Sequence, residues 1–321
     1  MKTLFATILA LQTAAVCAQG VIHHTPIEDK ATATLIIGGY PDWVEIGEQS
    51  VWVSNDALNV VQRIDPSTNK VIAAIKVNTP CAAFTIGYGS VWVASCADQA
   101  IVRISLADNS ILATIPLIIA DPEGSITTGD GSVWILSDKK GKLSRINERT
   151  NKVEASIDVA PSSFAAASGY GSIWITNTGD NPNASGSVQR IDPKSNRVIT
   201  TIEVGKQPRF LAVGEGGVWT LNQTDGSVTR IDPQTNKVVA TILCDVPGTG
   251  GDIAAGEGYV WVRAKKELLV MIDPRENKVA EIFGPPAGSG AVRAGRGSVW
   301  VTAHDINKIW RLDRTSIKRK K

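Results

Sequence analysis

Histidine is the side chain best suited to proton transfer near neutral pH, and the chain has three histidines. His304 is followed directly by Asp305, and a carboxylate that orients an imidazole can make it a general base. Because neighbouring residues of an extended chain point to opposite sides, we expect His304 to be an exposed loop residue instead. His23 and His24 lie in a polar stretch near the N-terminus, where we expect disorder rather than metal binding.

Cysteines offer redox or nucleophilic chemistry, and three of them lie beyond the first 18 residues: Cys81, Cys96 and Cys244. Cys81 and Cys96 flank a glycine-rich turn. If Ile86 faces Val91 across that turn, the two cysteines stand directly opposite each other. We therefore predict a disulfide between them, with a pair of free thiols as the alternative. Cys244 is then the unpaired thiol, and no histidine accompanies it in a nucleophile motif.

A third group of candidate residues is polar and suited to hydrogen bonding. Each member lies either three residues after a recurring tryptophan or five residues before the first residue of a recurring glycine-rich turn. We predict that the group lines the mouth of a central channel. Its members are Asp42, Asn55, Ser95, Ser137, Asn177, Arg209 and Asn222. One carboxylate among amides and hydroxyls does not supply the clustered oxygens that Ca²⁺ or Mg²⁺ needs. We therefore predict a small polar ligand, with no metal and no cofactor; the alternative is that these side chains only satisfy their own loops.

The elements that must position these residues are set by an internal repeat. Valine or isoleucine followed by tryptophan recurs seven times, with the tryptophans at positions 52, 92, 134, 174, 219, 261 and 300, spaced by 40, 42, 40, 45, 42 and 39 residues. A period near 40 is the signature of a propeller or a solenoid. We predict that the seven indoles pack between adjacent sheets, where each buries about 200 Å².

Each repeat contains four strand-length runs that are rich in β-branched residues and lack a helical period. Turns such as Gly87-Tyr88-Gly89 supply residues that tolerate a positive φ in a tight hairpin. In turns such as Asp65-Pro66-Ser67-Thr68-Asn69, the aspartate can cap the turn and the asparagine tolerates the left-handed conformation. Four antiparallel strands in each of seven units predict an all-β, seven-bladed propeller.

The two ends of the repeat region predict how the ring closes. Blade seven lacks a convincing outer strand, because only the polar residues 314–321 follow Asp313. Residues 30–37 align with the fourth strand of the first blade, residues 70–77. We therefore expect this N-terminal segment to complete blade seven and to protect the ring from edge-to-edge association, which favours a monomer.

The N-terminus has the layout of a cleaved secretory signal: one lysine, an apolar run, and small residues before a cut expected after Ala18. We divide the chain into a signal peptide (1–18), a flexible segment (19–29), the propeller (30–313) and a basic tail (314–321). No later segment is long and apolar enough to span a bilayer. The mature protein is thus expected to be periplasmic or secreted. A formal charge of +2 disfavours nucleic acid as a partner.

The repeated form Gly-x-Gly-Ser-Val-Trp-Val, followed by Arg-Ile-Asp-Pro-x-Thr-Asn-Lys-Val, resembles the YVTN-type and virginiamycin B lyase-like propeller repeats of exported bacterial proteins. The resemblance covers residues 31–313. The lyase branch implies a magnesium-assisted elimination, with histidines at the start of innermost strands and glutamates just after the tryptophan strand. No blade has either residue at these positions, which are Asp42, Ala82, Gly124, Phe164, Arg209, Gly251 and Gly290 for the histidine, and Asn55, Ser95, Ser137, Asn177, Asn222, Ala264 and Ala303 for the glutamate.

We therefore expect an exported, non-enzymatic propeller whose polar loop face contacts a small polar ligand or a partner protein. The alternative is a metal-dependent lyase, or a lactonase-like hydrolase, of the virginiamycin B lyase-like group. The two differ at the channel mouth. The binding protein needs only the single acid Asp42, whereas the enzyme needs two or three acids around a divalent ion.

Overall fold

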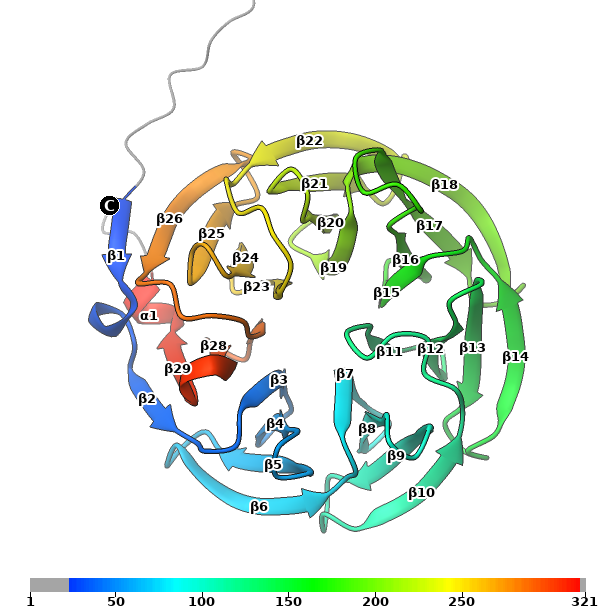
Figure 1. The fold of residues 1–321 in the computed structure, drawn as a ribbon, viewed down its shortest axis with the longest axis horizontal. Helices are drawn as coiled ribbons and strands as arrows, with labels where there is room; N and C mark the ends of the chain where they lie inside the picture. Colours follow the sequence, from blue (N-terminus) through cyan, green and yellow to red (C-terminus); the bar gives the residue numbers. More distant parts are fainter. Residues whose placement is uncertain (1–22, 318–321) are drawn as a thin grey trace, which may run out of the picture.

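Short β-branched runs alternate with glycine or asparagine turns along the whole chain, and each run forms a strand. The computed structural model describes residues 23–317. In it the strands form seven antiparallel sheets arranged as blades around a central axis (Figure 1). The sequence prediction of a seven-bladed propeller with four-stranded blades is confirmed.

Each blade contributes one strand to each of four concentric positions. The innermost strands are β3 (Pro41–Ile46), β7 (Pro80–Gly87), β11 (Ile126–Gly129), β15 (Ser163–Gly169), β19 (Pro208–Gly214), β23 (Gly251–Gly256) and β27 (Val292–Gly295). The second strands are β4 (Val51–Asn55), β8 (Ser90–Ser95), β12 (Ser132–Asp138), β16 (Ser172–Asn177), β20 (Gly217–Asn222), β24 (Tyr259–Ala264) and β28 (Ser298–Ala303). The third strands are β5 (Val60–Asp65), β9 (Ala100–Ser105), β13 (Lys142–Asn147), β17 (Ser185–Asp192), β21 (Ser227–Asp232), β25 (Leu269–Asp273) and β29 (Lys308–Asp313). The outermost strands are β6 (Lys70–Lys76), β10 (Ile111–Pro116), β14 (Val153–Asp158), β18 (Arg197–Lys206), β22 (Lys237–Leu243), β26 (Lys278–Gly284) and β2 (Ala33–Ile36).

The recurring tryptophans lie on the second strands and are completely buried, as predicted. In six blades an arginine of the third strand stacks over the indole of its own blade, with the guanidinium carbon 4.6 to 5.6 Å from the ring centroid. The same arginine donates through Nη1 to the asparagine Oδ1 of the next blade's outer turn, at 2.8 to 3.4 Å. These asparagines have φ between 53° and 65°, so the left-handed conformation expected for them is confirmed.

Blade six departs from this pattern because Met271 replaces the arginine. A different arginine, Arg263 on β24, joins blade six to blade seven. It is fully buried and donates to the backbone oxygens of Thr302 at 3.0 Å and Ser289 at 3.1 Å. The ring therefore has a side-chain link between blades at this position too.

The N-terminal segment closes the ring as the sequence predicts. Strand β2 pairs antiparallel with β29 of blade seven, with Ala33 opposite Arg311 and Ile36 opposite Lys308. Figure 1 shows this blue strand lying beside the red C-terminal blade. An N-terminal strand and three C-terminal strands are thereby held in one sheet, which closes the ring.

The segment before β2 is more ordered than expected. The predicted signal peptide lies outside the described residues, but β1 (His23–Pro26) adds to blade six as a fifth strand, parallel to β26. It is followed by the 3-10 helix η1 (Ile27–Asp29), in which Ile27 is fully buried. The expectation of a flexible segment is therefore wrong from residue 23 onward, and so is the expected disorder of the two histidines at its start.

The first turn of the predicted basic tail is also ordered. Helix α1 (Arg314–Ile317) places Ile317 in the same buried cluster as Ile27, so both ends of the described part of the chain pack beside blades six and seven. An apolar residue within the otherwise polar residues 314–321 was the sequence signal for this contact. The described residues contain no helix that is long and apolar enough to cross a bilayer.

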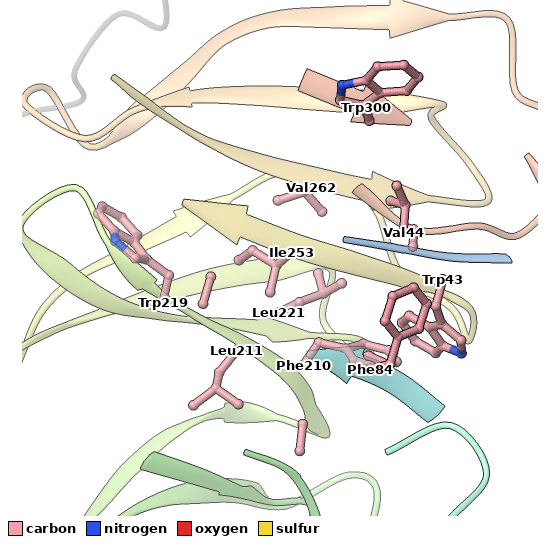
Figure 2. Packing of buried hydrophobic residues seen from close by; sticks show 14 of the residues in the cluster. Trp43, Val44, Phe84, Phe210, Leu211, Trp219, Leu221, Ile253, Val262 and Trp300 are labelled. Carbon is pink, nitrogen blue, oxygen red and sulfur yellow. The ribbon is translucent and has the colours of Figure 1, made fainter. Parts of the chain in front are cut away.

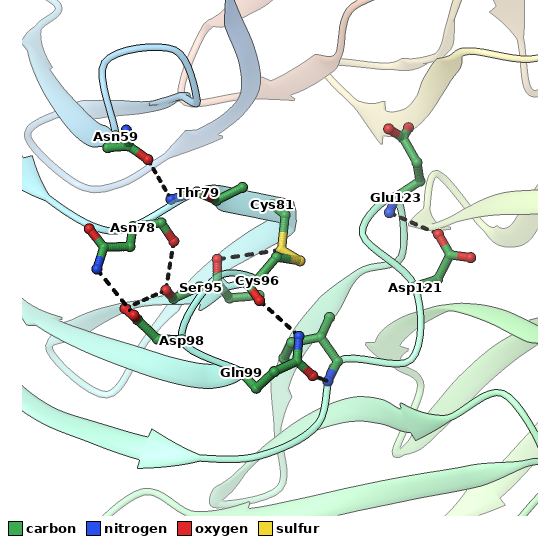
Figure 3. Close-up of a disulfide and its surroundings, with 12 residues drawn as sticks. Asn59, Asn78, Thr79, Cys81, Ser95, Cys96, Asp98, Gln99, Asp121 and Glu123 are labelled. Carbon is green, nitrogen blue, oxygen red and sulfur yellow. Dashed lines mark hydrogen bonds between the residues drawn. A yellow bond between two sulfur atoms is a disulfide. The ribbon is translucent and has the colours of Figure 1, made fainter.

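The predicted disulfide between Cys81 and Cys96 is confirmed, with a Cα–Cα distance of 5.9 Å (Figure 3). The predicted strand register behind it is wrong in detail. Ile86 does face Val91, but the register shifts between Cys81 and Thr85, so that Cys81 faces Ala94. The bond is therefore diagonal across the hairpin rather than between directly opposed residues.

Candidate functional site

Five of the seven residues predicted to line the channel mouth are at the ends of second strands, inside the blades. Asn55 Nδ2 donates to Gly38 O at 2.7 Å, and Ser95 Oγ donates to Asn78 O at 2.6 Å. Figure 3 shows Ser95 held by Asn78 and Asp98. These contacts fix the loops at the end of the blades.

The other three members of this group are held in the same manner. Ser137 Oγ lies 2.7 Å from Ser144 Oγ, and the Asn177 amide donates to Pro161 O. Asn222 is fully buried, and its Nδ2 donates to two hydroxyls of β21 at 2.9 Å each. The second strand is one strand removed from the axis, so the structure does not bring these five side chains together on one surface.

Asp42 and Arg209 lie on the innermost strands β3 and β19. Burial and, to a smaller extent, the negative charge of Glu123 raise the pKa of Asp42 to about 7, whereas His304 acts in the opposite direction. The Arg209 guanidinium lies 4.2 Å from the centroid of the Phe164 ring. Of the predicted set, these two residues are the ones placed at the channel.

His304 also belongs to this mouth, contrary to the expectation that it and Asp305 point apart. The two residues begin the 3-10 turn η2 (His304–Ile306), where the chain is not extended, and Nδ1 of His304 lies 2.9 Å from Asp305 Oδ1. The imidazole stacks on Tyr40 at 5.0 Å, and its Nε2 lies 4.0 Å from Asp56 Oδ1. The mouth therefore combines a carboxyl of raised pKa with an oriented histidine.

An aromatic layer closes the channel just below this mouth. Trp43, next to Asp42, contacts Phe210 at 5.8 Å, and Phe164 meets Phe210 edge-on at 5.4 Å. These residues come from blades one, four and five, so rings from opposite sides of the propeller meet across the axis. Figure 2 shows Trp43 and Phe210 side by side with Phe84, and all of these rings are buried. The layer separates the mouth from the rest of the channel.

The remaining part of the channel is a chamber of about 320 Å³, lined by residues of all seven innermost strands. Small alanine side chains and the hydroxyls of Thr85, Thr127 and Ser168 form much of its wall. This volume is in the lower range of small-molecule sites.

An ionic triplet stands in this chamber. Arg293 Nε lies 3.2 Å from Glu45 Oε2, and its Nη1 forms an ion pair with Asp252 Oδ2. Asp252 also accepts the backbone N–H groups of Val292 at 3.1 Å and Ile253 at 2.8 Å. About a fifth of the Arg293 and Glu45 side-chain surfaces is exposed, 20% and 23%, so a ligand in the chamber can reach both.

Burial and charge act against each other in this triplet. Desolvation raises the pKa of Glu45 and of Asp252, and the nearby Arg293 partly offsets it in both. Burial alone would lower the pKa of Arg293, but the two carboxylates outweigh burial and raise it. The guanidinium is therefore always charged, and the two acids give the cluster a net negative charge when both are ionised.

Sequence reasoning missed this triplet because it counted only the first position of each innermost strand. Asp252 occupies the next position, and Glu45 and Arg293 lie two residues further along the repeat. Other blades have small, hydroxyl or apolar residues at those two positions. The available signal was that three charged residues occupy repeat positions at which the inner strands of the other blades are uncharged.

Cys244 is the free thiol, as predicted. Burial raises its pKa to about 12, which makes it a weak nucleophile at neutral pH. Within residues 23–317, no group of three or more His, Cys, Asp or Glu side chains is arranged to hold a metal ion.

Several solved structures are similar to this fold. Virginiamycin B lyase from Staphylococcus aureus superposes with a TM-score of 0.71 at 19% sequence identity, over 88% of this chain and 98% of the lyase. The chain shares its fold with virginiamycin B lyase. A catalytically inactive variant of that enzyme, solved with quinupristin, superposes with a TM-score of 0.73 at 17% identity.

Two further neighbours have different names. Hydrazine synthase from Kuenenia stuttgartiensis matches with a TM-score of 0.72 at 11% identity, over 88% of this chain and 97% of that one. BamB from Moraxella catarrhalis matches with a TM-score of 0.63 at 11% identity, over 87% and 85%. No family model and no curated protein sequence matches the chain. At these identities the similarity establishes the fold, and the function must be argued from the site.

Proposed function

We propose that the protein is an exported binding protein that holds a small polar ligand in the central channel. The ionic triplet of the chamber is the observation that supports this most. It places an accessible guanidinium and an accessible carboxylate among hydroxyl groups in the channel, where a ligand is partly removed from water.

The charge of the chamber favours one kind of ligand. With both acids ionised, two carboxylates face one guanidinium, and the hydroxyls add donors and acceptors. A neutral polyhydroxylated molecule, or one with an ammonium group, complements this lining better than an anion does. The disulfide supports export, because such bonds persist in oxidising compartments.

A thermal-shift screen of monosaccharides, amino sugars and small amines tests this proposal. Compounds that raise the Tm are then titrated by calorimetry into the wild type and into Glu45→Gln. We expect the dissociation constant to increase by at least about tenfold in that variant. Ser137→Ala is the matched control, because Ser137 contacts Ser144 inside a blade, and it should bind like the wild type. Ligands that bind Glu45→Gln as well as the wild type would place the site elsewhere.

A second candidate function, hydrolysis at the mouth, is favoured by one observation. The pKa of Asp42, raised to about 7, suits a general acid or base, and His304 lies among its electrostatic neighbours. Assays with p-nitrophenyl acetate and a simple lactone test it. If Asp42 is the base, the rate should rise with pH through about 7 and should be abolished in Asp42→Asn. A rate that is the same in the variant and the wild type excludes this role.

A further inference from the structure

Trp52 differs from the other tryptophans of the repeat in having an unpaired indole N–H. In five blades the indole Nε1 donates to the carbonyl oxygen of the glycine five residues earlier, at 3.0 to 3.1 Å. Trp300 donates to Ser298 Oγ at 3.2 Å. Trp52 is fully buried, yet its Nε1 has no hydrogen-bond partner among the described residues. A buried donor without a partner is costly, so its presence in a cavity wall points to a missing acceptor.

The first hairpin turn of blade one explains why the partner is lost. Blade two has Tyr88 and Gly89 at the tip of this turn, with φ of 54° and 69°. Blade one has Glu48 and Gln49 there, and neither has a positive φ. The Cβ of Gln49 disfavours the left-handed conformation that glycine adopts easily. The turn therefore takes another form, and the Gly47 carbonyl does not receive the indole N–H.

A pocket of about 680 Å³ lies beside this unusual turn, between blades one and two. Trp52 and Gly47 both line it, so the indole with the unpaired N–H is part of the pocket wall. Two arginines, Arg63 and Arg296, line the same pocket. Arg296 Nη2 lies 3.6 Å from Glu48 Oε1, and both side chains are more than half exposed.

Part of the wall is apolar, and Glu45 and Glu48 also line the pocket beside the two arginines. Ile46, Ile86 and Leu106 line the pocket together with Tyr88. Arg63 is held by Ser50 at 2.7 Å and by Leu106 O at 3.1 Å. In three other blades the matching arginine also donates through Nη2 to the backbone of its own hairpin turn, whereas Arg63 makes no such bond among residues 23–317.

From these contacts we propose that the pocket binds an organic carboxylate with an apolar body. One carboxylate oxygen accepts the Trp52 Nε1–H, the guanidinium groups of Arg63 and Arg296 complement its charge, and the apolar body packs on Ile46 and Ile86. This site adjoins the channel chamber, because Glu45 and Thr85 line both cavities, but its proposed contacts lie in the gap between two blades on the side of the hairpin turns.

Octanoate is the probe for a direct test, with octan-1-ol and octylammonium as matched compounds of the same chain length. The indole N–H resonance of Trp52 is assigned in the ¹⁵N-labelled full-length protein by its absence in Trp52→Phe. We expect octanoate to shift this resonance downfield and to bind saturably. The alcohol and the ammonium compound should bind at least about tenfold more weakly, because neither offers a charged acceptor.

Gln49→Gly is the decisive variant, because it should restore the turn and leaves Trp52, Arg63 and Arg296 in place. Gln49 itself lines the pocket, so Gln49→Ala controls for the loss of its side chain. Gln49→Gly creates the Gly-Glu-Gly sequence found at residues 214–216 and 256–258, where the first glycine accepts the indole N–H at 3.0 Å. We expect octanoate affinity to fall at least about tenfold in Gln49→Gly and to stay unchanged in Gln49→Ala, which keeps a Cβ. Equal binding of octanoate and octan-1-ol, an unshifted Trp52 resonance, or an unaffected Gln49→Gly variant would each overturn the proposal.

Discussion

Asp42 is the residue whose protonation should leave the clearest mark on stability. Its pKa is raised from near 4 to about 7 in the folded protein. An acid with a raised folded-state pKa binds its proton more tightly when folded, so its contribution to stability is present below about pH 4 and is lost as the pH rises to about 7. Residues retained for function often reduce stability, and the stability that Asp42 loses on ionising near neutral pH is a cost of this kind.

We predict that Asp42→Asn is more stable than the wild type at pH 8 but not at pH 4. The amide cannot ionise, so the variant avoids burying a charge beside Glu123. A gain of about 1 kcal/mol would raise the Tm by about 2–4 °C at pH 8. Thermal unfolding at both pH values measures the difference. The same Tm difference at pH 4 and pH 8 would show that the carboxyl does not titrate in this range.

Arg293 should be required for stability because it compensates two buried acids at once. We predict that Arg293→Leu lowers the free energy of unfolding by about 3–5 kcal/mol, since Glu45 and Asp252 then lose their shared cation. The loss should be larger at pH 8 than at pH 5, because more of both carboxyls must ionise. Urea unfolding at the two pH values tests this. Arg296→Leu, an exposed arginine of the next turn, is the control and should change stability by less than about 0.5 kcal/mol.

Among the elements, the first hairpin of blade two has a covalent link in addition to its hydrogen bonds. The link joins residues 15 apart in sequence, and a loop of that size is worth about 3 kcal/mol in chain entropy. We predict that the double variant Cys81→Ala, Cys96→Ala loses about that much stability. Dithiothreitol should lower the Tm of the wild type towards that of the variant and leave the variant unchanged. A wild type that does not respond to the reductant while unfolding reversibly would contradict this prediction.

The elements themselves were predictable because each repeat carries its own turn chemistry. Asp65 accepts the N–H of Ser67 at 2.8 Å, and Asn69 has a φ of 55°, as the sequence predicts for both. The hairpin of Cys81 shows where this reasoning stops. A bulge depends on how the inner strand fits against the neighbouring blades, and the chain's own sequence does not reveal it.

For the whole molecule, the critical element is the strand that joins the two ends of the chain. In β2 the side chain of Leu35 is 8% exposed and that of its neighbour Ile36 is 79% exposed. We predict that Leu35→Asp destabilises the protein by about 3 kcal/mol or more, because it buries an unpaired carboxylate in blade seven. Ile36→Asp, one residue along the same strand, should cost less than about 0.5 kcal/mol. Equal effects of the two variants in urea unfolding would mean that β2 does not close the ring.

The candidate site could be predicted only in part, because its residues meet across the axis. Asp42 and Arg209 were found by counting along the repeat, since the start of an innermost strand must lie near the channel. Asn55 and Asn222 have the same polar character, but the strand in front of them covers them. Polarity at one repeat position does not tell whether a side chain meets a ligand or its own loop.

The sequence by itself determined the number of blades, the strands, the closing segment and the disulfide partners. These features follow from local turn chemistry and from a 40-residue period, both of which are properties of neighbours in the chain. Only the tertiary structure decided that Trp43 and Phe210 close the channel and that Glu45 and Asp252 share Arg293. Those contacts join blades one, five, six and seven across the axis, and their free energies depend on burial and distance that no single repeat encodes.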